Sequence, residues 1–453
     1  MHLLNKIVLL LTLFGICLPI QAADTVQISA ILETRDHFDD EAGNNADADD
    51  PAIWINPDDP SKSLIVATLK EGGLDVYTLD GKLLQHIAAA PAPACSYPLE
   101  SCNDNAPGRL NNADIIYDFE LSDTKIDVIV VSERGLDKLV FFAVNHKNLD
   151  KGRPPLINIT ASETPLIFSA NQDEVNTQRT AYGLATAADE DDFFAFVSQN
   201  DTTNVTQLRL IDNGLGKVTY RQENTFSLPE VFSLPNGASW TPCTDDDFDG
   251  PHVEGMVADV GNDVLFLGQE DVGIWKIDLD DPTDQEAWEL FAKVKEFGVP
   301  FTRVFDPEEE EFICTLAFDN DPGFGDAFLS ADVEGLTIYD AGDDEGYLLV
   351  SSQGDNTIVI FNRDDQNYIG SFTVVDGVVD GVDETDGMMV TNVNLGGLFT
   401  QGMVVMQDGE NKITGCSIDE VERGDASNFK FVRWSDIAEP LNLEIDTKDR
   451  TRK

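Results

Sequence analysis

Basic residues are scarce in this chain of 453 residues, with 29 Lys and Arg against 84 Asp and Glu and a formal charge of −55. Like charges at this density repel nucleic acid and anionic membranes, so we expect neither as a partner. Such acidity fits a solvated surface suited to salty or cold water, and it also fits sites for hard cations such as calcium. The surface accounts for most of the carboxylates and metal sites for roughly ten to fifteen of them.

Long apolar runs are missing beyond the first 23 residues, which excludes a later membrane span. Those first residues carry one lysine, an apolar stretch over 7–20 and small residues at the end, which is the pattern of a secretory signal peptide. We expect the signal over 1–23, one domain over 24–445 and a frayed C-terminal tail over 446–453. The mature protein is then secreted or periplasmic, with no membrane attachment after signal cleavage.

Cysteine motifs for zinc are also lacking, because no Cys-x-x-Cys pair occurs among the six cysteines. Cys95 and Cys102 bracket a short loop, so in an oxidising compartment we expect a local disulfide there. Of the three cysteines that follow, we expect Cys243 to pair with Cys314.

Several nucleophile motifs are absent as well. The chain has no Cys followed by five residues and Arg, no Arg-His-Gly, no Gly-x-Ser-x-Gly and no Walker loop. These absences exclude the usual cysteine and histidine phosphatase loops and the nucleophile elbow. A catalytic histidine has little support, since only His252 lies near a motif of interest, so a metal-held water remains as the nucleophile.

Amphipathic helices are nearly absent, the best being a short piece near 283–297. Strand-like runs separated by Gly, Asp and Asn turns predict an all-β protein. The predicted strands are Leu64–Thr68, 74–79, 126–132, 139–144, 193–198, 207–211, 264–267, 274–277, 347–351, 358–361, Tyr368–Val374, 403–406 and 429–433. We expect inserted loops at 88–109 and 235–251, the second with an acidic run that lacks EF-hand spacing and is better explained as solvated.

The strands belong to a sequence pattern that is repeated six times. Six anchors open an apolar segment: Asp50-Pro-Ala-Ile-Trp, Asp114-Ile-Ile-Tyr, Tyr182-Gly-Leu-Ala, Glu254-Gly-Met-Val, Glu334-Gly-Leu-Thr and Asp386-Gly-Met-Met. Each is followed by a strand-like run with a polar end, at Lys70, Arg134, Asn200-Asp201, Glu270, Gln353 and Asp408. Short-strand repeats of this length predict a six-bladed β-propeller, in which equivalent positions face one central axis.

An acidic residue before glycine is usually a turn residue, but six such motifs in register favour a shared site. Five acidic anchors around one axis need positive charge among them, and calcium accepts oxygen ligands from different blades. With Lys70 and Arg134 beside such ions, the mouth of the ring becomes a receptor for phosphate.

Longer motifs add a family resemblance. The segments are Asp49-Asp50-Pro-Ala-Ile-Trp, Gly-Leu-Asp-Val-Tyr-Thr-Leu-Asp-Gly-Lys82, Gly108-Arg-Leu-Asn-Asn-Ala-Asp114, Val253-Glu-Gly-Met, Gln269-Glu-Asp-Val-Gly-Ile-Trp275, Asp332-Val-Glu-Gly-Leu-Thr-Ile-Tyr339, Ser351-Ser-Gln-Gly, Glu384-Thr-Asp-Gly and Gln407-Asp-Gly-Glu-Asn411. Together they resemble the β-propeller phytases over 49–434.

The resemblance implies a secreted phosphoric monoester hydrolase that needs several calcium ions and removes phosphate from phytate, myo-inositol hexakisphosphate. It implies catalytic roles for Glu254, Glu270, Glu334 and Asp386. The implied phosphate-binding residues are Lys70, Arg134, Tyr182, Asn200 and Asp201. The implied calcium ligands are Asp49, Asp50, Glu254, Glu270, Asp332, Glu334, Gln353, Asp380, Asp386, Asp408, Glu410 and Asn411.

One position departs from the resemblance. Asn200-Asp201 stands where those enzymes carry Lys-Glu, so one phosphate contact should be weaker. The inferred mechanism is direct attack of a calcium-bound water on phosphorus, with the calcium complex of phytate as substrate. Two alternatives stay open: a secreted calcium-stabilised propeller that binds polyanions or glycans without catalysis, and a different phosphoesterase on the same ring. We expect a monomer, because a closed ring has few free strand edges.

Overall fold

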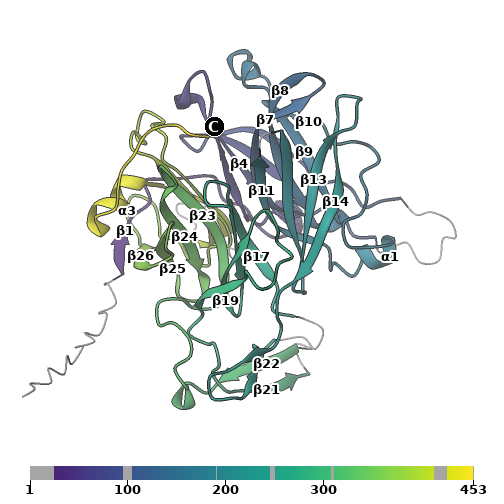
Figure 1. The fold of residues 1–453 in the computed structure, drawn as a ribbon. Helices are drawn as coiled ribbons and strands as arrows, with labels where there is room; N and C mark the ends of the chain where they lie inside the picture. The colour runs from purple at the N-terminus through teal and green to yellow at the C-terminus, as the bar shows by residue number, and fades with distance from the viewer. Residues whose placement is uncertain are drawn as a thin grey trace, which may run out of the picture.

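The computed structural model describes residues 25–94, 105–189, 191–244, 250–307, 311–412 and 426–451. The expected signal segment, the Cys95 and Cys102 pair and the acidic run at 245–249 lie outside these residues. Almost all regular structure in the described part is β-strand, arranged as separate sheets around an axis (Figure 1).

Six antiparallel sheets form the blades, and each runs from an inner strand at the axis to an outer strand. Blade 1 has β3 (Pro51–Trp54), β4 (Leu64–Thr68), β5 (Leu74–Thr78) and β6 (Leu83–Ile87); blade 2 has β7 (Leu110–Leu121), β8 (Thr124–Glu133), β9 (Lys138–Val144) and β10 (Leu156–Asn158). Blade 3 has β11 (Ala181–Asp189), β12 (Asp192–Gln199), β13 (Asn204–Asp212) and β14 (Val218–Ser227); blade 4 has β17 (Val253–Asp259), β18 (Val264–Gln269), β19 (Gly273–Asp278) and β20 (Glu289–Lys293).

The last two blades use strands from the start of the chain. Blade 5 has β23 (Val333–Gly342), β24 (Glu345–Ser352), β25 (Thr357–Asn362) and β26 (Tyr368–Val374), with β1 (Val26–Ile28) added in parallel. Blade 6 has β27 (Met388–Thr391), β28 (Met403–Asn411), β29 (Ala426–Arg433) and, outermost, β2 (Leu32–Glu33).

Contacts between the inner strands close the ring. They run in chain order through β3, β7, β11, β17, β23 and β27, and β27 then contacts β3. Apolar clusters fill the spaces between neighbouring blades, as where Phe266 of blade 4 shares a cluster with Phe361 of blade 5. The prediction of an all-β, six-bladed propeller is therefore confirmed, and every predicted strand falls within or at an observed one.

The prediction of a short helical piece near 283–297 is wrong. That segment contains β20, in which Leu290 pairs with Trp275 and Ala292 pairs with Ile274. The apolar residues Trp288, Leu290 and Ala292 recur every second position, which is the strand period, and they pack on the blade 4 core. The longest α-helix of the described residues, α3 (Trp434–Leu441), instead follows the last strand and buries Trp434 and Ile437.

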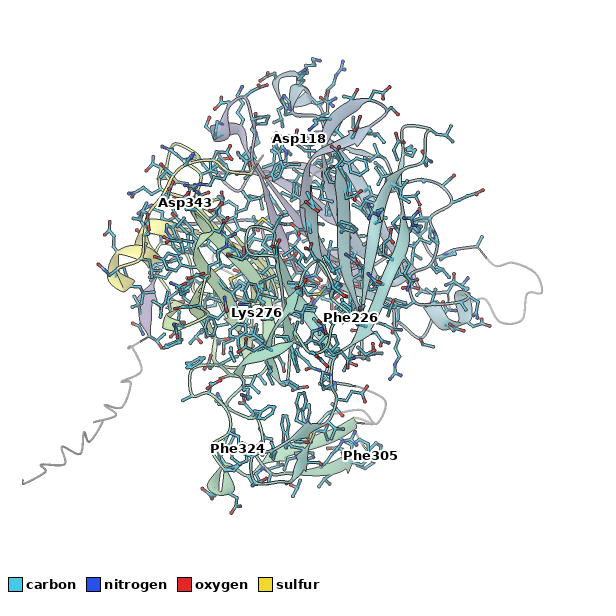
Figure 2. The ribbon with its side chains drawn as sticks, viewed as in Figure 1. Asp118, Phe226, Lys276, Phe305, Phe324 and Asp343 are labelled. Carbon is cyan, nitrogen blue, oxygen red and sulfur yellow. A yellow bond between two sulfur atoms is a disulfide. The ribbon has the colours of Figure 1, made fainter. Side chains whose placement is uncertain are left out.

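A small lobe projects from the ring (Figure 1). It contains the hairpins β15 (Phe232–Ser233) with β16 (Ser239–Trp240) and β21 (Phe301–Asp306) with β22 (Glu311–Leu316). Cys243 and Cys314 form a disulfide that ties β22 to the segment after β16, which confirms the predicted pair. Figure 2 shows Phe305 and Phe324 in this lobe.

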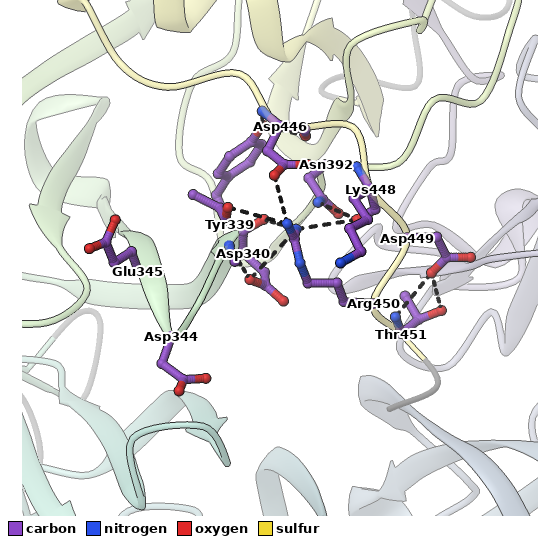
Figure 3. A network of polar contacts seen from close by, with 12 residues as sticks. Tyr339, Asp340, Asp344, Glu345, Asn392, Asp446, Lys448, Asp449, Arg450 and Thr451 are labelled. Atoms are coloured by element: carbon purple, nitrogen blue, oxygen red, sulfur yellow. Dashed lines mark hydrogen bonds and ion pairs between the residues drawn. The ribbon is translucent and has the colours of Figure 1, made fainter.

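The segment after α3 is ordered, contrary to the expected frayed tail. The Tyr339 hydroxyl donates to the carbonyl of Asp446 (2.9 Å), and Asn392 Nδ2 donates to the carbonyl of Lys448 (2.8 Å). Arg450 pairs with Asp446 (2.6 Å) and donates to the carbonyls of Asp340 and Ala341 (Figure 3). Since β23 and β27 end at this level, the segment lies at the end of the ring opposite the mouth; the inner strands begin at the mouth. No helix of the described residues is long and apolar enough to cross a membrane.

A buried ammonium holds blade 6 to the N-terminal strand. Lys430 of β29 is fully buried, and its Nζ lies 2.7 Å from Glu33 Oε2, 3.2 Å from Asp408 Oδ2 and 2.6 Å from Asn411 Oδ1. It also pairs with Asp380. Burial lowers the pKa of Lys430, but the bonds to Asp380 and Glu33 raise it further, so the side chain stays charged.

This cluster predicts the effect of removing the lysine charge. We expect Lys430→Met to lower the free energy of unfolding by about 3–5 kcal/mol, because the change leaves buried carboxylates uncompensated. Chemical denaturation checks this, with Lys412→Met as the control, since Lys412 pairs with Asp376 on the exposed surface. Equal losses in both variants would contradict the structural role of Lys430.

Candidate active site at the mouth of the ring

Beta-bulges aim the anchor side chains at the axis. The pairing of inner and second strands shifts between Leu110 and Ala113, Ala181 and Leu184, Val253 and Met256, and Val333 and Leu336. A bulge leaves residues out of the ladder and redirects their side chains. Tyr182, Glu254 and Glu334 are such residues, so these anchors are strand residues in a shared site and not turn residues.

Glycine follows these anchors because the inner strands nearly touch there. A Cβ on Gly183 would lie 2.0 Å from the Glu254 carbonyl oxygen, and one on Gly255 would lie 2.0 Å from that of Glu334. The amide of Gly335 donates to the carbonyl of Asp386 (2.8 Å). Each anchor therefore sits against the backbone of the next, and a larger residue after the anchor would separate the blades.

In blade 2 the structure corrects the expected anchor. Asn111 occupies the bulge and donates its amide to Glu254 Oε1 (2.7 Å), whereas Asp114 lies further along β7. Asp114 Oδ2 accepts from the amide and hydroxyl of Thr186 (2.7 and 2.8 Å), which joins blades 2 and 3. The spacing of Leu110-Asn-Asn-Ala113 equals that of Val253-Glu-Gly-Met256, and this signal identifies Asn111.

Three carboxylates converge at the mouth. One oxygen each of Glu254, Glu270 and Glu334 lies within 4.8 Å of the others, and all three residues are buried. Burial raises the pKa of Glu270 to about 7, against the opposing effect of His252, and burial with Glu270 and Glu254 raises the pKa of Glu334. Among the described residues, Glu334 Oε2 has no hydrogen-bond partner. Such a cluster is stable when positive charge lies among the oxygens.

Lys70 and Asp386 stand beside the cluster. Lys70 Nζ lies 2.6 Å from Asp47 Oδ2 and 3.3 Å from Asp386 Oδ2, and Gln353 donates to Asp386 Oδ1 (2.8 Å). Burial raises the pKa of Asp386 to about 7, offset in part by Lys70. Asp49 is 1% exposed, and within the described structure both its carboxylate oxygens lack hydrogen-bond partners. Its pKa is raised by burial, with Lys70 opposing.

Tyr182 connects the carboxylates to two cationic side chains. Its hydroxyl donates to Glu254 Oε2 (2.5 Å), and the Arg134 guanidinium lies 4.8 Å from its ring centroid. The imidazole of His252 meets the same ring edge-on at 5.4 Å, with Nε2 2.8 Å from Glu270 Oε1. Burial lowers the pKa of His252, but Glu270 raises it to about 10. His252 directly precedes the Val253-Glu-Gly-Met segment, but the sequence analysis found little support for a catalytic histidine and did not place it in the site.

The remaining predicted site residues fall into two groups, one near the mouth and one away from it. Asn200 donates its amide to Asp201 Oδ1 (2.8 Å) and the Gln178 carbonyl (3.4 Å), while Asp332 lies near Glu270. Asp50 Oδ2 accepts from the Ala113 amide (2.9 Å) and so joins blades 1 and 2. The remaining set is apart from the mouth: Asp380, Asp408 and Asn411 surround Lys430, and Glu410 is exposed.

Beneath the anchors the ring is narrow. A cavity of about 50 Å³ there is lined by residues of the inner strands, including Asp50, Asp114, Gly255 and Gly335. This is room for a few water molecules.

Comparison with known proteins agrees with this geometry. A family model described as Phytase matches residues 1–232 and 321–453. The chain belongs to the phytase family. It is 30% identical over 449 residues to a 3-phytase of Bacillus subtilis (strain 168), an alignment covering 96% of this chain and 94% of that protein. The expected family and enzyme class are thus confirmed.

Solved structures give weaker similarities. A chain from the crystal structure of BBS1N in complex with ARL6DN has a TM-score of 0.36 at 9% identity, covering 84% of this chain and 78% of that one. The Myceliophteria thermophila Cps50 (Swd1) β-propeller domain has a TM-score of 0.35 at 9% identity, covering 84% of this chain and 83% of that domain. Likenesses with TM-scores this low support no inference about this chain.

The donor set of this phytase-family chain fits calcium. Its mouth offers buried carboxylates from several blades, with partnerless oxygens on Asp49 and Glu334 among the described residues. Calcium prefers hard oxygen ligands and tolerates variation in their number and geometry. Zinc is disfavoured, since the described residues of the mouth include one histidine and no cysteine.

The raised carboxyl pKa values predict how metal-free stability depends on pH. Glu270 and Asp386 have pKa values of about 7 in the fold against ordinary values of 4.5 and 3.8, so the folded state keeps protons that the unfolded state has lost. Stability therefore falls as pH rises from about 4 to 7, on the order of a few kcal/mol. Calcium, which binds the ionised form, should flatten this slope. Melting curves from about pH 4.5 to 8 with chelator and with calcium test it; parallel slopes would contradict the prediction.

Proposed function

We propose that this chain removes phosphate from phytate in a calcium-dependent reaction at the mouth of the ring. The observation that carries the proposal is the convergence of buried Glu254, Glu270 and Glu334 beside two cations, Lys70 and Arg134, in a phytase-family chain. A site that binds both metal and phosphate explains this combination. Carboxylates without a metal would repel phosphate, and a site that bound phosphate through Lys70 and Arg134 alone would have no use for the carboxylate cluster.

The acidic residues hold the metal in this proposal. Glu254, Glu270, Glu334 and Asp386 are the principal ligands, with Asp49, Asp332 and Gln353 at the edge of the same cluster. Bound calcium supplies positive charge and lowers the pKa of a coordinated water to make the nucleophile. Tyr182 and Asn111 each hydrogen-bond one oxygen of Glu254 and so fix the orientation of that carboxylate.

The cationic side chains bind the substrate phosphates. Arg134 is held by the face of Tyr182, and its Nε has no hydrogen-bond partner among the described residues. A guanidinium fixed in this way can bind a phosphate with two parallel N–H donors. Lys70, already between two carboxylates, adds a point charge at the opposite side of Asp386 from Gln353.

The charge of the whole molecule bears on the substrate. A chain of formal charge −55 repels free phytate, so we propose that the calcium complex is what binds. We also propose secretion and a monomeric state, on the signal-like first 23 residues and the closed ring. Our proposal for calcium concerns the mouth alone, because Asp380, Asp408 and Asn411 already surround the Lys430 ammonium.

Metal dependence gives the first functional test. We expect the purified protein to release phosphate from phytate with added calcium and to lose the activity with a strong chelator. Glu254→Gln should lower kcat by roughly 10²–10³, because it removes a charge from the metal cluster. Glu289→Gln, on the exposed edge of the same blade, is the control. Binding of phytate without phosphate release would favour the non-catalytic alternative.

Substitution of Arg134 gives a second test. Arg134→Lys keeps the charge but loses the two-donor fork, so we expect KM for calcium phytate to rise about tenfold or more while calcium dependence is unchanged. Initial rates over a range of substrate concentrations measure this. Wild-type KM in the variant would remove Arg134 from the phosphate site.

A further inference from the structure

The two cations and the four principal acidic residues of the proposed site come from opposite halves of the ring. Lys70 follows β4 of blade 1 and Arg134 follows β8 of blade 2. Blades 4 to 6 supply the acidic residues Glu254, Glu270, Glu334 and Asp386. A phosphate held at the metal would therefore direct other phosphates of the same inositol ring toward blades 1 to 3. Blade 3 completes that half, so its side chains also meet the substrate.

Asn200, the residue of blade 3 at which the sequence predicts a phosphate contact, is poorly placed for that role. It is 4% exposed, and its amide nitrogen donates to Asp201 Oδ1 (2.8 Å) and to the Gln178 carbonyl (3.4 Å). The neighbouring Asp201 is a carboxylate with 27% of its side chain exposed. A phosphate on this side of the mouth therefore needs another donor.

The backbone of Arg179 lies where such a donor is required. Arg179 precedes the inner strand β11, and its carbonyl accepts from Nε2 of Gln199 (2.9 Å) at the end of β12. The hydroxyl of the next residue, Thr180, donates to the Arg134 carbonyl (2.6 Å). These bonds hold Arg179 between the mouth ends of blades 2 and 3, one step around the ring from Arg134.

The side chain of Arg179 reaches solvent beside Asp201. It is 34% exposed, and its Nε lies 3.9 Å from Asp201 Oδ2. Asp201 is close enough to His252 of the mouth to act on it electrostatically. Arg179 and Asp201 also line a cavity of about 690 Å³ with Thr202 and Gly250, a volume in the range of small-molecule sites. A guanidinium has five N–H donors, so pairing with one carboxylate leaves others for an anion.

We infer that Arg179 is a substrate-binding residue that donates guanidinium N–H groups to a phosphate of the bound inositol phosphate, in the sector where Asn200 does not. It extends the row formed by Lys70 and Arg134 into blade 3. The planar fork of arginine matches two oxygens of one phosphate. Its charge also offsets that of Asp201, which would otherwise repel the substrate at this edge. This inference rests on the proposed function, since it names a further contact within the same site.

A binding experiment tests the inference without relying on turnover. The probe is myo-inositol hexasulfate with saturating calcium, which presents the same ring of anions but no phosphomonoester. By calorimetry we expect Arg179→Gln to bind it at least about tenfold more weakly than wild type, the range for one hydrogen bond to a charged group. Arg179→Lys, which keeps the charge but loses the two-donor fork, should lose less.

Arg221→Gln is the matched control on the same blade. Arg221 belongs to the outer strand β14, its side chain is 63% exposed, and it pairs with Glu223 (2.6 Å). We expect this variant to bind hexasulfate as wild type does. A loss equal to that of Arg179→Gln would mean that only the net charge of the blade matters, and it would overturn the inference.

A double variant separates phosphate binding from charge compensation. If Arg179 only neutralises Asp201, adding Asp201→Asn to Arg179→Gln restores wild-type affinity for hexasulfate, and that result overturns the inference. We expect the double variant to bind at least about fivefold more weakly than Asp201→Asn alone, because the donors to phosphate are still missing. Calcium titrated without hexasulfate should bind Arg179→Gln and wild type equally. Weaker calcium binding with unchanged hexasulfate affinity at saturating calcium would assign Arg179 to the metal site instead.

Phosphate release is measured on the same variants. For an active wild type, we expect Arg179→Gln to raise KM for calcium phytate about tenfold while kcat falls less. A wild type that binds hexasulfate but releases no phosphate defeats the proposed function and leaves the test of Arg179 intact. A wild type that binds no hexasulfate overturns the inference.

Discussion

Mutual repulsion between carboxylates around one axis is the constraint on which this structure depends. Glu254, Glu270 and Glu334 are buried within a few ångströms of one another, and Asp49 and Asp386 stand beside them. The fold holds them there because the bulges of the inner strands aim them inward and the glycines allow neighbouring backbones to touch. The packing of the blades thus holds these carboxylates together despite their mutual repulsion. Their raised pKa values are a result of that repulsion and of burial.

Two acidic clusters in the ring differ in how their negative charge is neutralised. At the closure of blade 6, a lysine of the chain itself neutralises Glu33, Asp380 and Asp408, so that cluster carries its own counter-ion. At the mouth, Lys70 neutralises only its immediate neighbours, and partnerless oxygens remain within the described structure. A permanent counter-ion suits a joint that must stay closed. An exchangeable cation at the mouth would suit the proposed function, in which the same site also accepts phosphate.

Much of this arrangement can be predicted from the sequence, since buried strands and the repeated anchors identify a ring of six blades. The prediction fails where the result depends on register or long-range contact. Asp114 resembles an anchor in composition, but a bulge places Asn111 at the mouth instead. Lys430 looks like any strand lysine until β2 and blade 6 are brought together. His252 adjoins the Glu254 motif, but only its contacts with Tyr182 and Glu270 show that its side chain lies at the mouth.

The ordered segment around Arg450 has a consequence for molecular traffic. It lies at the far end of the ring (Figure 3), where Arg450 and Thr451 line a cavity of about 510 Å³ with residues of β7, β11 and β17, while the cavity beneath the anchors has room only for a few waters. The narrowest part of the ring is therefore at its inner strands, and a molecule larger than water that enters at the mouth cannot pass through the centre. Under the proposed function, product would have to leave through the same opening by which substrate enters.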